Sequence, residues 1–293
     1  MEYELDYKGN IKFSKFLMAG AISGVMEHSV MFPVDVIKTR MQSITHGKNY
    51  RQIGVVKSLS NLLKSNGIGG LMKGYPALVC GALPAHACYF TGYEYSKNKL
   101  NYLIKNENVI TGISASIATL CHDIFMTPAE AIKQRMQMHG NKFMNCLQCT
   151  KTCFNREGSR AFYRSFSTQL LTNLPFQISH FIIYENMQNV TNPNRKYNLL
   201  SHLASGAAAG GIAAAITTPL DVCKTVLNTQ DCPFYLKKAT YINSPIEAIR
   251  VIYKSNGYSG FFHGLKARAL LQAPGTAISW VVYELFKSTL LNN

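Results

Sequence analysis

The chain has 293 residues with a formal net charge of +15, 47% of its residues are hydrophobic, and its mean hydropathy is close to zero. No run of 18 or more uncharged apolar residues occurs, so hydropathy alone does not settle whether a helix crosses a membrane. The eight cysteines do not suggest a disulfide framework, and we find no nucleophile with a neighbouring base, glycine-rich phosphate loop or zinc-finger cysteine pair, which predicts a protein that is not an enzyme.

The positive charge is concentrated in three segments instead of being spread along the chain. Segments 43–74, 139–165 and 230–265 hold 5, 5 and 4 Lys or Arg residues against 0, 1 and 2 Asp or Glu residues, whereas segments 98–110 and 189–200 carry only +1 and +2. Such an asymmetry between connecting segments is typical of a membrane protein whose basic side faces anionic lipid. We therefore expect a membrane protein with no nucleic-acid partner.

The first predicted element is a long helix over residues 13–42. The ten residues at the start of the chain contain three acids, and a cleaved mitochondrial presequence would be rich in arginine and poor in acids, so we expect none. The second half of the helix contains Pro33, Asp35 and Lys38. The acid and the lysine are three positions apart, so they share one face of the helix.

This Pro-x-Asp/Glu-x-x-Lys pattern occurs three times, at Pro33, Pro128 and Pro219. The prolines are 95 and 91 residues apart, which identifies a tripled unit. We predict repeats over residues 13–103, 109–188 and 198–291. Threefold pseudosymmetry would close the charged helix ends into a ring of three ion pairs: Asp35 with Lys133, Glu130 with Lys224, and Asp221 with Lys38.

In each repeat, a short amphipathic helix and a second long helix should follow the first. The expected short helices lie near 54–65, 144–156 and 244–255, and the expected second long helices span 75–103, 164–188 and 264–291. Between them is another tripled motif, a glycine followed seven residues later by Gly74, Ser165 or Gly264. A cation precedes this position as Lys73 and as Arg164. A helix N-terminus with free amides next to a cation suits a lipid phosphate.

The second long helices end in a third tripled motif, Tyr-Glu-x-x-Lys or Tyr-Glu-x-x-Gln. Its charged members are Glu94, Lys97, Glu185, Glu284 and Lys287. We expect Glu185 to pair with Lys287 and Glu284 with Lys97, while Gln188 leaves Glu94 without an ionic partner. Ion pairs near water are worth only about 0–1 kcal/mol each, so these pairs can break and form again easily.

Together these motifs resemble the mitochondrial carrier family, whose signature is Pro-x-Asp/Glu-x-x-Lys/Arg-x-Lys/Arg. Gln42 and Gln137 match a glutamine that often follows in that family, whereas Val226 and Asn228 depart from the pattern in the third copy. The resemblance covers essentially the whole chain. It implies an all-α, multi-pass protein of the mitochondrial inner membrane, with six transmembrane helices in three pseudosymmetric repeats around a central cavity and short amphipathic helices on the matrix side.

The same resemblance assigns roles to the tripled motifs. It implies a matrix gate at the ion-pair ring with Gln42 and Gln137, and a cytoplasmic gate at the Tyr-Glu motifs. It also implies cardiolipin as a structural lipid at Lys73, Gly74, Arg164 and Gly264, and a monomer with no permanently bound cofactor.

Polar residues that occur in only one repeat are the candidates for binding an asymmetric substrate. Five residues before the repeated prolines stand His28, Asp123 and Ala214, and eight before the repeated glutamates stand His86, Gln177 and Thr276. The family's contact region corresponds to Gly81, Asn173 and Gln272. The sequence contexts of His28, His86 and His202 resemble the branch of the family that imports iron, in which these histidines are the proposed metal relay.

The chemistry of these residues agrees with iron(II), carried as the bare ion or as a small complex, because imidazole and carboxylate groups suit this metal. The candidate metal and substrate residues are His28, His86, His202, Asp123, Asn173 and Gln272. We expect His28 and Asp123 at one depth near the matrix gate, His86 midway and His202 at the outer mouth. The rival interpretation is a purely structural His28–Asp123 hydrogen bond. Two residues depart from the pattern of that branch: Thr172 stands beside Asn173 where a Met is expected, and Gln272 stands where an Asn is typical. Both differences concern the details of the site.

Two alternative functions stay open at this point. A carrier of an organic cation or nucleotide such as S-adenosylmethionine would need an Arg or an acid in the contact region, where the residues are neutral. A non-transporting scaffold would not need charge motifs at both gates. Finally, Cys146, Cys149 and Cys153 fall on one helical face, which favours burial as small apolar side chains over iron binding.

Overall fold

The computed structural model describes residues 13–43, 53–138, 143–193, 199–229, 242, 244–272 and 274–275. Within these ranges every regular element is helical and none is a strand, so the protein is all-α. The helices are α2 (Phe13–Gln42), α4 (Val55–Leu71), α5 (Tyr75–Leu100), α6 (Glu107–Met138), α7 (Cys146–Glu157), α8 (Arg160–Tyr163), α9 (Phe166–Thr191), α10 (Leu199–Thr229) and α11 (Pro245–Asn256), followed by the 3-10 helix η1 (Tyr258–Phe262). A further helical stretch covers 265–272, and the rest of the expected helix 264–291 lies largely outside the described residues.

The helix that carries each repeated proline runs without interruption through it. Pro33 lies inside α2, Pro128 inside α6 and Pro219 inside α10. At about 1.5 Å per residue, these helices of 30 to 32 residues exceed the roughly 30 Å thickness of a bilayer core. By length and composition, two stretches of the described helices qualify as membrane spans, Val109–Met138 and Leu200–Thr229.

Large apolar side chains on the outside of the long helices explain how a chain of near-zero mean hydropathy suits a bilayer. On α6 the exposed residues Ile113, Ile117, Leu120 and Ile124 recur every three or four positions. This spacing places them in a stripe along one face. A stripe of this kind suits lipid, while the opposite face keeps the polar residues.

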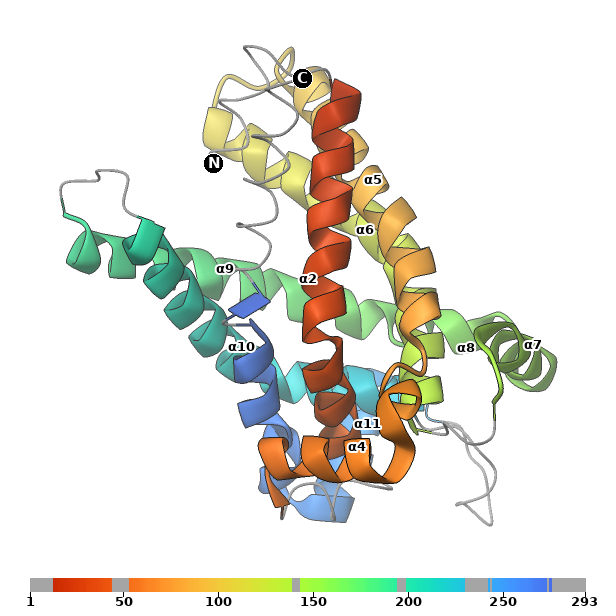
Figure 1. Ribbon diagram of the computed structural model, residues 1–293. Helices are drawn as coiled ribbons and strands as arrows, with labels where there is room; N and C mark the ends of the chain where they lie inside the picture. The colour runs from red at the N-terminus through yellow and green to blue at the C-terminus, as the bar shows by residue number, and fades with distance from the viewer. Residues whose placement is uncertain are drawn as a thin grey trace.

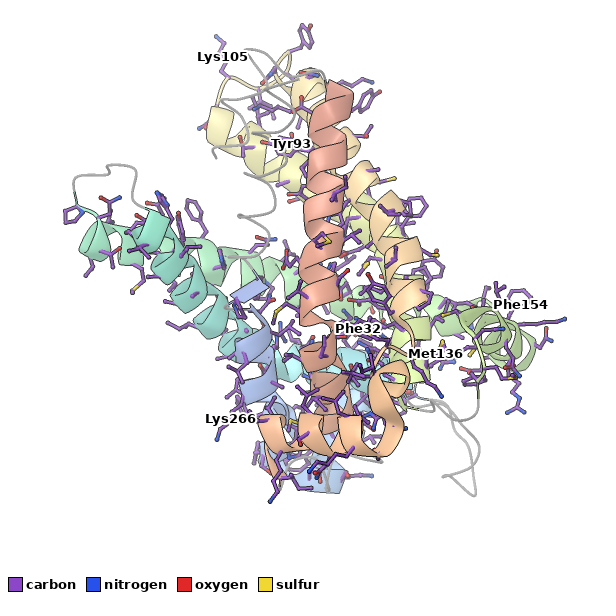
Figure 2. The ribbon with its side chains drawn as sticks, in the orientation of Figure 1. Phe32, Tyr93, Lys105, Met136, Phe154 and Lys266 are labelled. Carbon is purple, nitrogen blue, oxygen red and sulfur yellow. The ribbon has the colours of Figure 1, made fainter. Side chains whose placement is uncertain are left out.

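The long helices converge at one end of the molecule and separate toward the other (Figure 1). Helix α5 packs along α6, α9 along α10, and α2 along α5. Figure 2 shows Phe32 and Met136 toward the converging end, where α4 and α11 lie, and Tyr93 and Lys105 toward the separated end. The three proline-bearing helices therefore approach one another where their charged motifs are.

Three apolar clusters hold this end together, and each includes residues of one proline-bearing helix and of the amphipathic helix that follows it. In the first, Phe32 and Ile37 of α2 pack with Leu62 of α4. In the second, Met136 of α6 packs with residues of α7 and with Phe162 of α8, and in the third, residues of α10 pack with Ala248 and Ile252 of α11. Each amphipathic helix is therefore anchored to the end of its own proline-bearing helix, and this positions the charged residues between them.

Candidate functional site

The six charged residues of the expected ring (the ion-pair ring below) lie together where α2, α6 and α10 converge. Lys133 Nζ is 2.9 Å from Asp35 Oδ2, Lys38 Nζ is 2.9 Å from Asp221 Oδ2, and Lys224 pairs with Glu130. Each pair joins a different two of the three helices, so the pairs close a triangle. Because all six side chains are largely buried, loss of one partner would leave an uncompensated charge in the protein interior.

Two glutamines support the ring from the next helical turn. Gln42 Nε2 donates to Asp221 Oδ2 at 2.7 Å, and its Oε1 accepts from Thr225 Oγ1 at 2.7 Å. Gln137 Nε2 donates to Asp35 Oδ2 at 3.3 Å. The third copy of the motif has Asn228 here, and the side-chain atoms of Asn228 have no hydrogen-bond partner within the described chain. The departure from the sequence pattern at Asn228 thus corresponds to the absence, among the described residues, of a side-chain hydrogen bond like those that Gln42 and Gln137 donate to the ring.

Sequence reasoning missed Arg268, which contacts the ring from the stretch 265–272. Its Nη1 lies 3.2 Å from Asp221 Oδ2, and its guanidinium also donates to Thr217 O at 3.1 Å and to Thr217 Oγ1 at 2.8 Å. Comparison of the repeats marks this residue as unusual, although it does not identify its partner. Six residues before the prolines of the second long helices stand Leu78, Gln169 and Arg268, so only the third repeat has a charge there.

The residues expected at lipid sites lie close to the ring and have protein contacts of their own. Arg164 Nη1 is 3.0 Å from Glu157 Oε2, and Arg135 Nη1 is 3.0 Å from Glu157 Oε1. Gly74 has a φ of 87°, and a Cβ added to it would lie 2.9 Å from the carbonyl oxygen of Lys133. Lys73 immediately precedes Gly74, so it lies at the start of α5. The glycine therefore lets the start of α5 pack directly on the charged part of α6.

Gly264 repeats this arrangement in the third repeat. Its φ is 77°, and an added Cβ would lie 2.9 Å from Cγ of Gln42. Ser165, which replaces the glycine in the second repeat, has a right-handed φ of −91°. Ser165 therefore differs from Gly74 and Gly264 both in residue type and in lacking their positive φ.

Three histidines from three helices form a row. The ring of His28 on α2 lies 6.0 Å from the ring of His86 on α5, measured between centroids, and the ring of His86 lies 5.2 Å from that of His122 on α6. Gly24 on α2 makes room for the central histidine, because a Cβ at this position would come closer than 3.0 Å to three atoms of the His86 imidazole. Nε2 of His86 is buried and has no hydrogen-bond partner in the part of the chain that the structure describes.

Asp123, expected opposite His28, has other partners. It is 1% exposed, its Oδ2 accepts from Asn173 Nδ2 at 2.6 Å, and its Oδ1 lies 3.1 Å from His122 Nδ1. The ring contact of His28 is with His86. The structure thus brings together the expected residues Asp123 and Asn173, and it adds His122, the residue immediately before Asp123 on α6.

His202 lies in the first turn of α10, at the separated end of the helices. Its Nδ1 lies 2.6 Å from Tyr184 Oη and 3.1 Å from Gln188 Nε2, both on α9. Gln188, which cannot pair ionically with Glu94, holds this histidine instead. Gln272 lies in the stretch 265–272 and packs against Gly210 of α10, where an added Cβ would be 3.6 Å from the Gln272 Cβ.

The residues of the expected cytoplasmic gate are only partly described. Lys97 Nζ lies 5.7 Å from the centre of the Tyr93 ring, and the half-buried Glu94 is on the same helix. Glu185 is on α9. Glu284 and Lys287 lie outside the described residues, so both expected pairs of this gate do as well.

The donor groups offer pairs of ligands instead of a closed cage. Among the described residues no group of three or more His, Cys, Asp or Glu side chains is placed to hold a metal ion together. Cys149 and Cys153 are buried beside Met136 and Phe162, with their Sγ atoms 4.0 Å apart. The hydrogen bond between the two thiols, together with burial, raises the pKa of the Cys149 thiol, which stays protonated, whereas the same hydrogen bond lowers the pKa of the Cys153 thiol to about 6. At most one of the two sulfurs is therefore available as a thiolate ligand.

Comparisons with known proteins agree with the tripled architecture. The family model described as "Mitochondrial carrier protein" matches residues 9–103, 105–194 and 195–293. Mitoferrin-1 of Rattus norvegicus is 45% identical over 280 residues, covering 94% of this chain and 82% of the relative. Mitoferrin-2 of Homo sapiens is 44% identical over 275 residues, covering 92% and 76%. Mitochondrial RNA-splicing protein MRS4 of Saccharomyces cerevisiae is 37% identical over 297 residues, covering 99% and 97%.

Proposed function

The chain belongs to the mitochondrial carrier protein family, and we propose that it imports iron(II) into the mitochondrial matrix by opening alternately to the two sides of the membrane. It is a multi-pass protein of the mitochondrial inner membrane and a transporter, not an enzyme. Similarity to the mitoferrins over more than nine tenths of the chain supports iron as its cargo.

The observation that supports this cargo best is the adjacency of His28 and His86. These two imidazoles, from different helices, lie 6.0 Å apart between ring centroids. Nε2 of His86 is buried and has no hydrogen-bond partner in the described chain. Imidazole nitrogen binds Fe(II) well without the permanence of a thiolate cage. A transporter needs few ligands that exchange readily, because a closed site would retain the ion.

We further infer that the ion-pair ring is the matrix gate. Its three buried pairs hold α2, α6 and α10 together in the conformation seen here, while the other ends of the helices stand apart (Figure 1). In this interpretation His202 meets the ion at the outer mouth, and His86 and His28 hold it before release. The cytoplasmic gate would form from Glu94, Lys97, Glu185, Glu284 and Lys287 when the ring opens.

Cardiolipin is proposed as the structural lipid at the starts of the second long helices, at Lys73, Gly74, Arg164 and Gly264. The glycines at two of these helix starts have positive φ values, and helix N-termini offer free amides to phosphate. The protein is proposed to act as a monomer, with iron(II) or a small iron complex as its substrate and no permanently bound cofactor.

Uptake of radioactive iron(II) into cardiolipin-containing liposomes, kept reduced under anaerobic conditions, tests the proposal. The purified protein should take up iron faster than protein-free liposomes do. The His86→Ala variant should lose at least about tenfold in rate, since removing even a supporting contact of a metal ligand costs that much. His263→Gln, at the end of η1, is the matched control and should behave like the wild type. Uptake by the wild type at the protein-free rate would refute the proposal.

A further inference from the structure

We propose that His122 is an additional iron(II) ligand and that Asp123 and Asn173 are positioning residues that orient it. The ion would pass between neighbouring pairs of imidazoles in the row His28, His86 and His122. This inference rests on the proposed transport of iron, and it changes the role of Asp123 from direct ligand to support.

The spacing of the row fits one ion held by two rings at a time. A metal–nitrogen bond of about 2.1 Å puts an imidazole centroid roughly 3.3 Å from the metal, so two rings on one ion have centroids about 4.7–6.6 Å apart, depending on the angle at the metal. The His86–His122 separation of 5.2 Å and the His28–His86 separation of 6.0 Å both lie in this range. Both pairs share His86, so an ion could be handed from one pair to the other without leaving imidazole coordination.

The carboxylate next to His122 selects the tautomer that such a ligand needs. Because Asp123 Oδ1 accepts a hydrogen bond at 3.1 Å from His122 Nδ1, the proton of the neutral imidazole is on Nδ1, and Nε2 is left as an acceptor. Metal-binding histidines commonly have such a carboxylate on their second nitrogen. Tyr89 flanks the same ring, 6.4 Å away between centroids.

Asp123 is in turn held rigidly. Its Oδ2 accepts a short hydrogen bond of 2.6 Å from Asn173 of α9, and its side chain is 1% exposed, compared with 20% for that of His122. With one oxygen engaged by His122 and the other by Asn173, the carboxylate is poorly placed to bind the ion directly. Its negative charge, one residue from the row, would still favour a dication there.

An independent sign of an exchangeable ligand comes from His86. Its buried Nε2 has no hydrogen-bond partner among the described residues, although buried polar atoms are nearly always satisfied. The other imidazole rings that flank it belong to His28 and His122. A metal ion bound between His86 and either neighbour would satisfy this nitrogen.

The test measures iron(II) affinity directly, by anaerobic titration calorimetry of the purified wild type and variants. His122→Gln should weaken iron(II) binding at least about tenfold with little change in the thermal unfolding midpoint. Asp123→Asn should weaken it less, because an amide oxygen still accepts the Nδ1 proton while the charge is lost. His263→Gln is the control and should bind as the wild type does. Wild-type affinity in His122→Gln would overturn the inference.

A second measurement on the wild type protects the test against a variant that fails to fold. Iron(II) should slow the modification of His122 and His86 by diethyl pyrocarbonate, located by peptide mass spectrometry, but not that of His263. Equal modification of His122 with and without iron would also overturn the inference. If the wild type transports iron while His122 is neither protected nor needed for binding, only this inference fails. If the wild type neither binds nor transports iron, the proposed function fails with it.

Discussion

Asp221 has more partners than the other two acids of the ion-pair ring, and its loss should therefore be the most damaging. Its carboxylate is 2.9 Å from Lys38 Nζ and 3.2 Å from Arg268 Nη1, and it accepts a third contact from Gln42 at 2.7 Å. Asp35 has one lysine and one glutamine as partners. The change Asp221→Asn removes the charge that compensates two buried cations, whereas Asp35→Asn leaves a single lysine uncompensated.

The expected difference follows from these contacts. Removing one partner of a buried ion pair costs about 3–5 kcal/mol, and this cost applies to both variants. The additional contact of Asp221 with Arg268 is a second buried ion pair, and we take its worth as about 1.5–3 kcal/mol, the range for polar contacts to a charged group. With about 2–4 °C per kcal/mol for chains of this general size, Asp221→Asn should unfold about 3–12 °C below Asp35→Asn.

Thermal unfolding of the purified variants in the same detergent and lipid, followed by intrinsic fluorescence, measures this difference. Adding Arg268→Gln to Asp221→Asn should recover part of the loss, because only Lys38 then remains unpaired. A double-mutant cycle with the two single variants isolates the coupling between Asp221 and Arg268. Equal unfolding midpoints for Asp35→Asn and Asp221→Asn, together with additive effects in the cycle, would show that Arg268 does not contribute to the ring.

Two other changes probe the packing around the site. Gly24→Ala should displace the His86 ring, which lowers stability by about 1–3 kcal/mol and slows iron uptake. Gly211→Ala is the control, because nothing lies within 4 Å of an added Cβ, and it should keep the wild-type rate. Equal uptake by both variants would contradict the packing argument. Replacing the three α7 cysteines by serine should lower the unfolding midpoint, because hydroxyls would enter an apolar cluster, but should leave iron uptake intact; loss of uptake in a folded protein would instead indicate a metal-binding role.

The sequence alone was enough for the family, the tripled plan and the residues at the ion-pair ring. Helix α2 spans Phe13–Gln42, as its pattern predicted, because helix formation is decided largely by neighbouring residues. The ion-pair ring could be predicted because an acid and a lysine three positions apart follow each of the three prolines. Threefold pseudosymmetry places the acid of one helix next to the lysine of another. Asn228, whose side chain has no hydrogen-bond partner within the described chain, was likewise visible in the sequence as a departure from the repeated motif.

The partners of Asp123 and Arg268 needed the tertiary structure. Successive residues on a helix differ by about 100° in direction, and sequence cannot set how far each helix is rotated about its axis. Packing decides that rotation, as Gly24 shows by admitting the His86 ring against α2. It placed His122 in the row of imidazoles and turned Asp123 toward Asn173 on α9, 50 residues away in the chain. It also brought Arg268 to Asp221, a contact without a counterpart in the other repeats from which symmetry could have predicted it.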